Sequence, residues 1–271
     1  SVFRPLQSGD VVFRFQLDGE VILMVDGKQV AEKVYVKNPT NLYTLQAKAG
    51  KEYHIEILFK QRNERATLDF DLGKQVEINL NLAVEKVKDA DIVLFAGGIS
   101  PSLEGEEMPV EVPGFKGGDR TDIELPAVQR DLLKALKKAG KKVVFINYSG
   151  SAIGLVPESN TCEAILQAWY PGQAGGTAIV DVLFGDYNPA GRLPVTFYKN
   201  AGQLPDFEDY SMKGRTYRYM QQEPLFPFGH GLSYTDFTYG EAKLSKNTIA
   251  KGENVVLTIP VSNVGQRDGE E

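Results

Sequence analysis

Three carboxylates stand close together just after the apolar run 91–98, Asp-Ile-Val-Leu-Phe-Ala-Gly-Gly. They are Glu104, Glu106 and Glu107, and a stretch rich in Pro and Gly separates them from Asp119 and Arg120. A carboxyl group crowded by other carboxylates can hold its proton to higher pH and donate it near neutrality. The cluster therefore predicts general acid/base chemistry. The competing interpretation is a set of solvated loop acids, because Glu is mostly exposed in proteins.

The elements around this loop follow a strand-helix-strand rhythm. Continuous apolar residues predict strands buried on both faces at 92–95 and 143–146. Apolar residues at helical spacing predict a helix that runs through 128–136 and ends at Gly140, and a second helix near 174–184 that ends at Gly185. Residues 193–198 are expected to return as a strand. This alternation predicts a parallel sheet with right-handed crossovers, and ligands bind beyond the carboxyl ends of such strands.

Two flanking regions have the two-residue period of β-strands. From residue 1 to about 82, apolar and polar residues alternate in several runs, and the pairs Asp18-Gly19 and Asp26-Gly27 are typical of hairpin turns. An antiparallel β-sandwich is expected there. Beyond Phe237, the alternation of Val255, Leu257, Ile259 and Val261 predicts one further strand.

Composition excludes several classes of function. The net charge is −6 without a dense Lys/Arg run, which argues against a nucleic-acid partner. Cys162 is the single cysteine, and His54 and His230 are the two histidines, so a thiolate or histidine metal site is not expected. We expect no cofactor. No membrane span is expected either, because no apolar stretch approaches ~20 residues. Ser1 does not open a signal peptide, so any export signal is expected outside this sequence.

The ordered succession of motifs from residue 83 onward resembles the C-terminal portion of family 3 glycoside hydrolases, the β-glucosidases and β-xylosidases. The residues that carry the resemblance are Ser102-Leu-Glu-Gly-Glu-Glu107, Gly118-Asp-Arg120, Ile123-Glu-Leu-Pro126, Trp169-Tyr-Pro-Gly172, the run 175–185, the run 188–196 and Phe226-Pro-Phe-Gly-His-Gly-Leu-Ser-Tyr234. The resemblance implies an α/β sandwich domain over 83–236. Residues 1–82 resemble part of a PA14 module, and 237–271 resemble the start of a fibronectin type III-like domain.

The resemblance implies a retaining, exo-acting β-glycosidase that acts on oligosaccharides or other β-glycosides. In this family the nucleophilic Asp lies on an N-terminal (β/α)8 barrel, which this sequence does not contain, so the fragment alone is expected to be inactive. The general acid/base matches Glu106 first, Glu104 second and Glu107 third. Glu107 and an insertion through Pro113 and Phe115 interrupt the family's Glu-Gly-x-Asp-Arg pattern. A periplasmic or extracellular location is also implied.

Four further residues are candidates for sugar contacts. Asp119 and Arg120 are expected either to brace the acidic loop or to contact sugar hydroxyls, and Arg215 and Tyr217 either stack on a sugar or pack against Phe226 and Phe228. Two other functions are alternatives. A carbohydrate-binding module would use the first β region for recognition. A doubly wound nucleotide-binding domain is disfavoured, because no Gly-rich phosphate motif is present.

Overall fold

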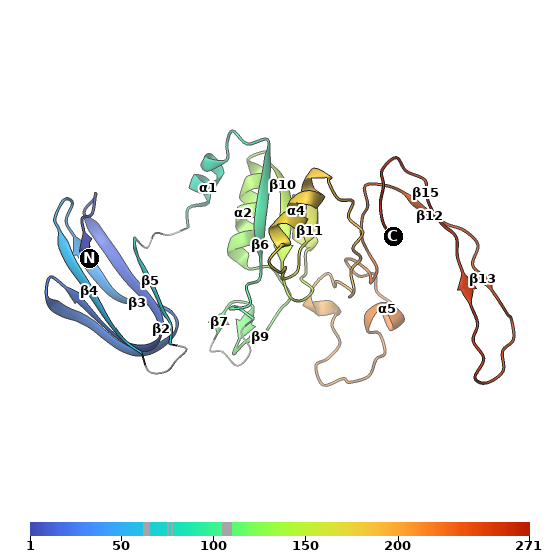
Figure 1. Ribbon diagram of the computed structural model, residues 1–271, viewed down its shortest axis with the longest axis horizontal. Coiled ribbons are helices and arrows are strands. Elements are labelled where there is room, and N and C mark those ends of the chain that lie inside the picture. Colours follow the sequence, from blue (N-terminus) through green and yellow to red (C-terminus); the bar gives the residue numbers. More distant parts are fainter. Residues whose placement is uncertain (62–65, 75, 77, 105–109) are drawn as a thin grey trace. The chain divides into compact units, whose positions relative to one another are not determined.

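The chain consists of two compact units, residues 1–78 and 79–271. They are seen in a computed structural model, which describes every residue except 62–65, 75, 77 and 105–109 (Figure 1). The boundary at Ile78 falls four residues before the predicted end of the first β region. Each unit has a hydrophobic core of its own.

The first unit is an antiparallel sheet. Its strands are β1 (Val2–Phe3), β2 (Gly9–Val25), β3 (Lys28–Ala47), β4 (Tyr53–Lys60) and β5 (Leu68–Gly73). They pair in the order β1-β4-β2-β3, and β5 joins the first half of β2. The predicted antiparallel pairing is present, but the described strands form one sheet rather than the two layers of the expected sandwich.

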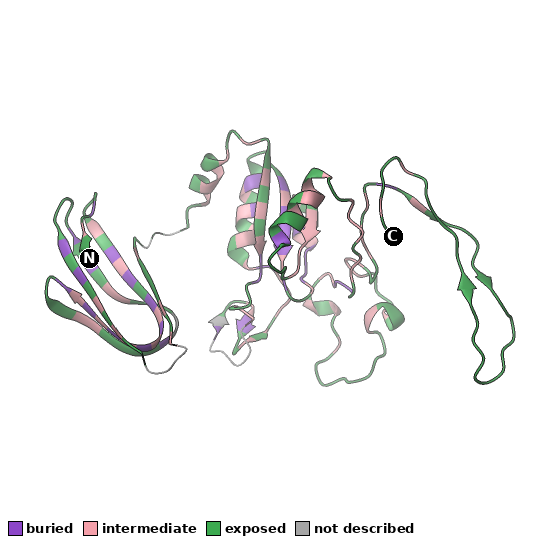
Figure 2. Cartoon of the chain, in the orientation of Figure 1, coloured by how far each residue is buried: buried purple, intermediate pink, exposed green. Residues whose placement is uncertain are grey.

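Alternating side chains of β2 build the core of this unit. Phe13, Phe15 and Leu17 are buried, whereas Arg14 between them is exposed, and Figure 2 shows this alternation along the strand. The prediction of a hairpin turn at Asp18-Gly19 was wrong. The ladder to β3 shifts register there without ending, and Gly19 has a φ of 152° that favours glycine. Asp26-Gly27 does form the turn that joins β2 to β3.

The second unit combines a parallel sheet with helices and short antiparallel pairs. Its helices are α1 (Leu80–Lys86), α2 (Ala127–Lys138), α3 (Val156–Thr161), α4 (Gly175–Phe184), the 3₁₀ turn η1 (Ala201–Gln203) and α5 (Thr216–Tyr219). Its strands are β6 (Ile92–Gly98), β7 (Glu111–Val112), β8 (Phe115–Lys116), β9 (Asp119–Arg120), β10 (Lys142–Tyr148), β11 (Ala164–Gln167), β12 (Phe237–Tyr239), β13 (Lys243–Leu244), β14 (Leu257–Thr258) and β15 (Val261–Asn263).

The strands β6, β10 and β11 form the predicted parallel sheet, with β10 in the middle. On one face, Val143 and Phe145 of β10 are buried together with Leu133 and Leu136 of α2. The prediction that the strand at 92–95 is buried on both faces was wrong. In the described part of the chain β6 is an edge strand, and Ile92 and Leu94 on its other face are half exposed.

Both predicted helices are present, and glycines end them as expected. Gly140 (φ 74°) follows α2, and Gly185 (φ 82°) caps α4 in the left-handed conformation. The strand predicted at 193–198 does not form. In its place, Phe197 makes an isolated bridge to Phe226. The single strand predicted near 255–261 is also divided, because Pro260 lies between β14 and β15 and cannot donate to a ladder.

Candidate active site

The acidic loop begins at the carboxyl end of β6, where the backbone is held tightly. The side-chain amide of Gln129, on α2, donates to the carbonyl of Gly98 at 2.7 Å and accepts from its N–H at 2.8 Å. Gly98 has a φ of 131°, and a Cβ there would lie 1.9 Å from the carbonyl oxygen of Tyr148. A side chain therefore has no room at this position, and the loop leaves the sheet along a fixed path.

Glu104 is the acidic residue of this loop that the structure describes. Its Oε1 accepts a hydrogen bond from the Ser151 hydroxyl at 2.9 Å, and its Oε2 accepts one from the Tyr170 hydroxyl at 2.8 Å. An Arg120 nitrogen lies 3.8 Å from Oε1. The Glu104 side chain is 21% exposed. The carboxyl group is thus fixed in direction, yet solvent still reaches it.

Arg120 joins this cluster from β9. It donates to the Ser151 hydroxyl at 2.8 Å and to the backbone carbonyls of Asp122 and Ala152, both at 3.2 Å. Its Nη2 is buried without a hydrogen-bond partner among the described residues. Burial lowers the pKa of Arg120, and the negative charge of Glu104 opposes this effect. The neighbouring Asp119 is exposed, and no ion pair joins it to Arg120 in the described chain.

Tyr170 closes the cluster from the loop after β11. Its hydroxyl lies 2.7 Å from the carbonyl oxygen of Ile99, in addition to its contact with Glu104. Burial raises the pKa of Tyr170, and the hydrogen bond to Glu104 raises it further, since ionising the phenol would place two anions side by side. The hydroxyl is therefore a lasting hydrogen-bond donor.

The other predicted acids, Glu106 and Glu107, lie outside the described residues.

Arg215 and Tyr217 stand in a different part of the second unit. Arg215 donates to the carbonyls of Ser211, at 2.7 Å, and Asp209, which shapes its own loop. The Tyr217 ring stacks on Phe228 with centroids 4.5 Å apart. The packing interpretation is therefore present for Tyr217, while 56% of that residue stays exposed.

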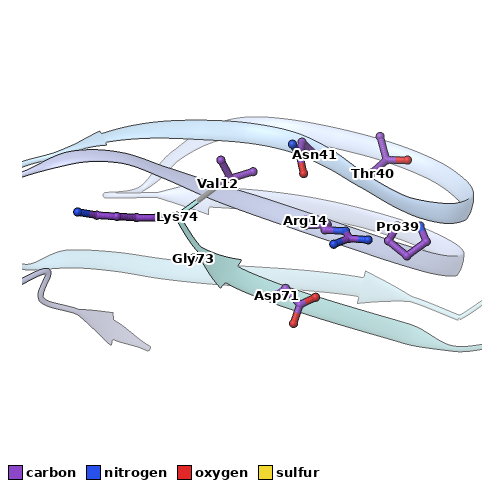
Figure 3. A pocket seen from close by; sticks show the side chains of 8 residues that line it. All are labelled: Val12, Arg14, Pro39, Thr40, Asn41, Asp71, Gly73 and Lys74. Carbon is purple, nitrogen blue, oxygen red and sulfur yellow. The ribbon is translucent and has the colours of Figure 1, made fainter. Parts of the chain in front are cut away.

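A separate polar trough of about 600 Å³ lies on the first unit, over the outer face of β2, β3 and β5 (Figure 3). Arg14 is paired in register with Asn41 of β3 and with Asp71 of β5, so these three residues form a row across the sheet. Arg14 and Asp71 are both exposed and form no ion pair with each other. Lys74 adds a second cation to the lining.

Groups of three or more His, Cys, Asp or Glu that could hold a metal ion are absent from the described residues. Among the same residues, no helix is long and apolar enough to cross a membrane.

Sequence reasoning missed Ser151, Tyr170 and Gln129 as parts of the site. Residues 149–151 follow β10, and residues 169–170 follow β11, just as the acidic loop follows β6. Because carboxyl ends of parallel strands meet at one edge, the position of these polar residues in each loop was the available signal.

The second unit is thus an α/β domain whose parallel sheet has a carboxylate, a guanidinium and two hydroxyls together at its carboxyl edge, the edge where open α/β sheets bind ligands. The model of the glycosyl hydrolase family 3 C-terminal domain matches residues 15–234, and the chain belongs to this family. The match includes most of the first unit, from the middle of β2 onward.

Named relatives agree with this assignment. A xylan 1,4-beta-xylosidase of Xylanibacter ruminicola is 52% identical over the whole chain, which spans 31% of that relative. A periplasmic beta-glucosidase of Salmonella typhimurium is 39% identical over 69% of the chain and 25% of its own length. A beta-glucosidase structure from Kluyveromyces marxianus shares the fold with a TM-score of 0.73 at 23% identity, over 98% of this chain and 33% of that one.

Proposed function

We propose that this chain forms the acid/base half of the active site of a retaining, exo-acting β-glycosidase, either a β-glucosidase or a β-xylosidase. The nucleophilic Asp belongs to an N-terminal barrel of the same protein. The observation that carries the proposal is the cluster at Glu104, where a carboxylate is fixed at the ligand-binding edge of the sheet. The names of the relatives support the substrate class, terminal β-linked glucose or xylose.

Retaining hydrolysis needs two carboxyl groups about 5–5.5 Å apart. One attacks the anomeric carbon, and the other protonates the departing oxygen and later removes a proton from water. We assign the second role to Glu106, because both oxygens of Glu104 already accept hydrogen bonds from the chain. Arg120 and Asp119 are proposed to contact sugar hydroxyls or to brace the loop, and Arg215 and Tyr217 to border the sugar.

At the level of domains, we propose a partial PA14-like module over 1–82, the α/β sandwich domain over 83–236 and the beginning of a fibronectin type III-like domain over 237–271. The antiparallel sheet of the first unit supports the first assignment. A periplasmic or extracellular location is supported by the relative whose name states that it is periplasmic.

The test replaces Glu106 by Gln in the full-length enzyme. Turnover of β-glycosides with poor leaving groups should fall by about 10²–10⁴-fold, the usual contribution of a positioned acid. Activated aryl glycosides, which need no protonation, should recover much of the rate. Equal losses on both kinds of substrate would reject the acid role.

The same proposal makes the isolated chain inactive, because covalent catalysis lacks its nucleophile. Purified chain 1–271 should release no sugar from aryl β-glycosides above the background of its own Glu106→Gln variant. A clear excess over that variant would contradict the division of the active site between two parts of the protein.

The trough on the first unit favours a second function, non-catalytic carbohydrate binding. The guanidinium of Arg14 and the carboxylate of Asp71 offer donors and acceptors side by side, which suits neighbouring hydroxyls of a neutral sugar. Arg14→Ala should then abolish binding of oligosaccharides to the chain, while Arg120→Met should not. The opposite result would assign sugar binding to the second unit.

A further inference from the structure

The carboxyl group of Glu104 is tied to two other loops of the sheet edge. Ser151 follows β10 and Tyr170 follows β11, and their hydroxyls lie 2.9 Å and 2.8 Å from the two carboxyl oxygens. Glu104 itself follows β6. One side chain therefore joins the three loops that leave the carboxyl ends of neighbouring parallel strands.

We propose that Glu104, Ser151 and Tyr170 are positioning residues, which fix the loop that carries the proton donor and exchange no proton with the substrate. The inference rests on the proposed function, since it takes Glu106 as the donor. A donor has to aim a protonated oxygen at the departing sugar oxygen. In Glu104, one carboxyl oxygen instead accepts from the Ser151 hydroxyl and the other from the Tyr170 hydroxyl. A nitrogen of Arg120 lies 3.8 Å from the oxygen that Ser151 contacts.

Ser151 is held by a buried hydrogen-bond network beneath it. The Ser149 hydroxyl donates to the backbone carbonyl of Ser151 at 2.9 Å, and the Gln167 amide donates to the Ser149 oxygen at 3.1 Å. Asn147 donates to the Gln167 oxygen at 2.6 Å. Asn147 and Ser149 are fully buried. Buried polar networks of this kind favour one arrangement, because each broken bond leaves a buried group unpaired.

Tyr170 is held by a strained backbone on one side and close packing on the other. The preceding Trp169 adopts a φ of 54°, and its ring packs edge-on against Phe197 at 6.1 Å. Such a conformation costs about 1 kcal/mol or more in a non-glycine residue and persists only where its surroundings fix it. A Cβ at Gly150 would lie 2.6 Å from the Tyr170 ring, so glycine there leaves the space that the ring occupies.

The variant Glu104→Gln tests the positioning role, because the Tyr170 hydroxyl has one hydrogen to donate and can also accept one. The Tyr170 hydroxyl carries a single hydrogen but lies near two oxygens, those of Ile99 and Glu104. In Glu104→Gln, the new amide N–H can donate to the Tyr170 oxygen, and the tyrosine hydrogen then bonds Ile99. The amide oxygen still accepts from Ser151. This variant keeps the contacts of Glu104 with Ser151 and Tyr170 while it replaces the carboxyl group by a neutral amide.

The experiment measures kcat and KM of the full-length enzyme on aryl β-glycosides with good and poor leaving groups. Glu104→Gln should keep turnover within about fivefold, whereas Glu104→Ala should lose about a hundredfold in kcat, most strongly with poor leaving groups. Tyr170→Phe and Ser151→Ala should each lose about three- to tenfold, the effect of one hydrogen bond. Tyr187→Phe is the matched control, because its hydroxyl bonds the surface residue Glu270 and should leave turnover unchanged.

A second measurement tests whether Tyr170 acts through Glu104. Tyr170→Phe should cost much less in the Glu104→Ala background than in the wild type, since its contact with Glu104 is already gone and only the bond to Ile99 remains. Additive losses would overturn the inference.

The inference also falls if Glu104→Gln is as slow as Glu106→Gln on poor leaving groups and its turnover recovers with activated leaving groups. In that case Glu104 is the donor and the proposed glycosidase function stands. Full turnover of Glu106→Gln on poor leaving groups would instead refute the proposed donor.

Discussion

Two arginines of the second unit lie beside carboxylates, and their contacts differ: among the described residues, Arg130 pairs with two carboxylates and Arg120 with one. Arg130 forms three hydrogen bonds of 2.7–3.0 Å with Glu158 and Glu124, and Glu158 is almost fully buried. Arg120 stays 3.8 Å from Glu104 and has one buried nitrogen without a partner among the described residues. Burial lowers the pKa of both groups, yet the bonds to Glu158 and Glu124 raise the pKa of Arg130 overall, whereas that of Arg120 stays lowered.

The difference distinguishes a structural cluster from the cluster that we propose to be functional. The Arg130 cluster satisfies its charges internally and joins α2, α3 and the loop before α2. The Arg120 cluster leaves positive charge and donor capacity at the carboxyl edge of the sheet, where we propose that the sugar binds. An arginine that is desolvated without a close counter-ion is expected at functional sites rather than in a structural support.

Removal of Glu158 should have the largest effect on stability. Glu158→Ala leaves the mostly buried Arg130 with one partner, the half-buried Glu124, and a broken buried pair costs about 3–5 kcal/mol. The midpoint of urea unfolding of the second unit should fall accordingly, while turnover of the folded full-length enzyme changes little. Glu85→Ala removes an exposed pair with Lys88 and serves as the control, with an expected effect of about 0–1 kcal/mol. Equal shifts in the two variants would contradict the structural role.

Replacement of each arginine by Met should affect stability in one case and turnover in the other. Arg130→Met leaves two carboxylates facing each other, so unfolding should become easier by about 3 kcal/mol or more. Arg120→Met should change stability by about 1 kcal/mol at most, because its desolvation is poorly compensated, and should slow turnover of the full-length enzyme by about tenfold. Circular dichroism in urea and steady-state kinetics measure the two effects. A large loss of stability in Arg120→Met would remove the distinction.

Cys162 offers a smaller effect that reports on the Arg130 cluster. Burial, together with the charges of Glu158 and Glu163, raises the pKa of its thiol from 9.0 to about 11. The reactive form is the thiolate, so the raised pKa leaves about a hundredfold less of it at pH 8. Alkylation by iodoacetamide should therefore be slow at pH 8 and accelerate up to about pH 11. It should also be faster in Glu158→Ala at pH 8, and an unchanged rate would show that the thiol does not sense the cluster.

The sequence predicted regular elements well and junctions poorly. Alternation in β2 and β4, and helical spacing in α2, are local signals of residues that face a core, and the structure confirms them. Asp18-Gly19 has the composition of a turn, but pairing with β3 on one side and β4 and β5 on the other carries the strand past it. Residues 193–198 have the pattern of a strand, yet only Phe197 finds a backbone partner.

The site shows the same limit. The acidic loop was visible because three carboxylates stand within four positions of the sequence. Ser151 and Tyr170 lie 47 and 66 residues away from Glu104. Only the parallel register of β6, β10 and β11 brings them together, and no local pattern specifies which polar residue of each loop turns inward.

The central claim is tested most directly by the distance between two carboxyl groups in a structure of the full-length enzyme with a bound sugar analogue. The account predicts that the Glu106 carboxyl lies about 5–5.5 Å from an Asp carboxyl of the barrel. Glu104 should remain bonded to Ser151 and Tyr170. If instead Glu104 leaves these hydroxyls and takes that place opposite the Asp, or if neither glutamate approaches the sugar, the account is wrong.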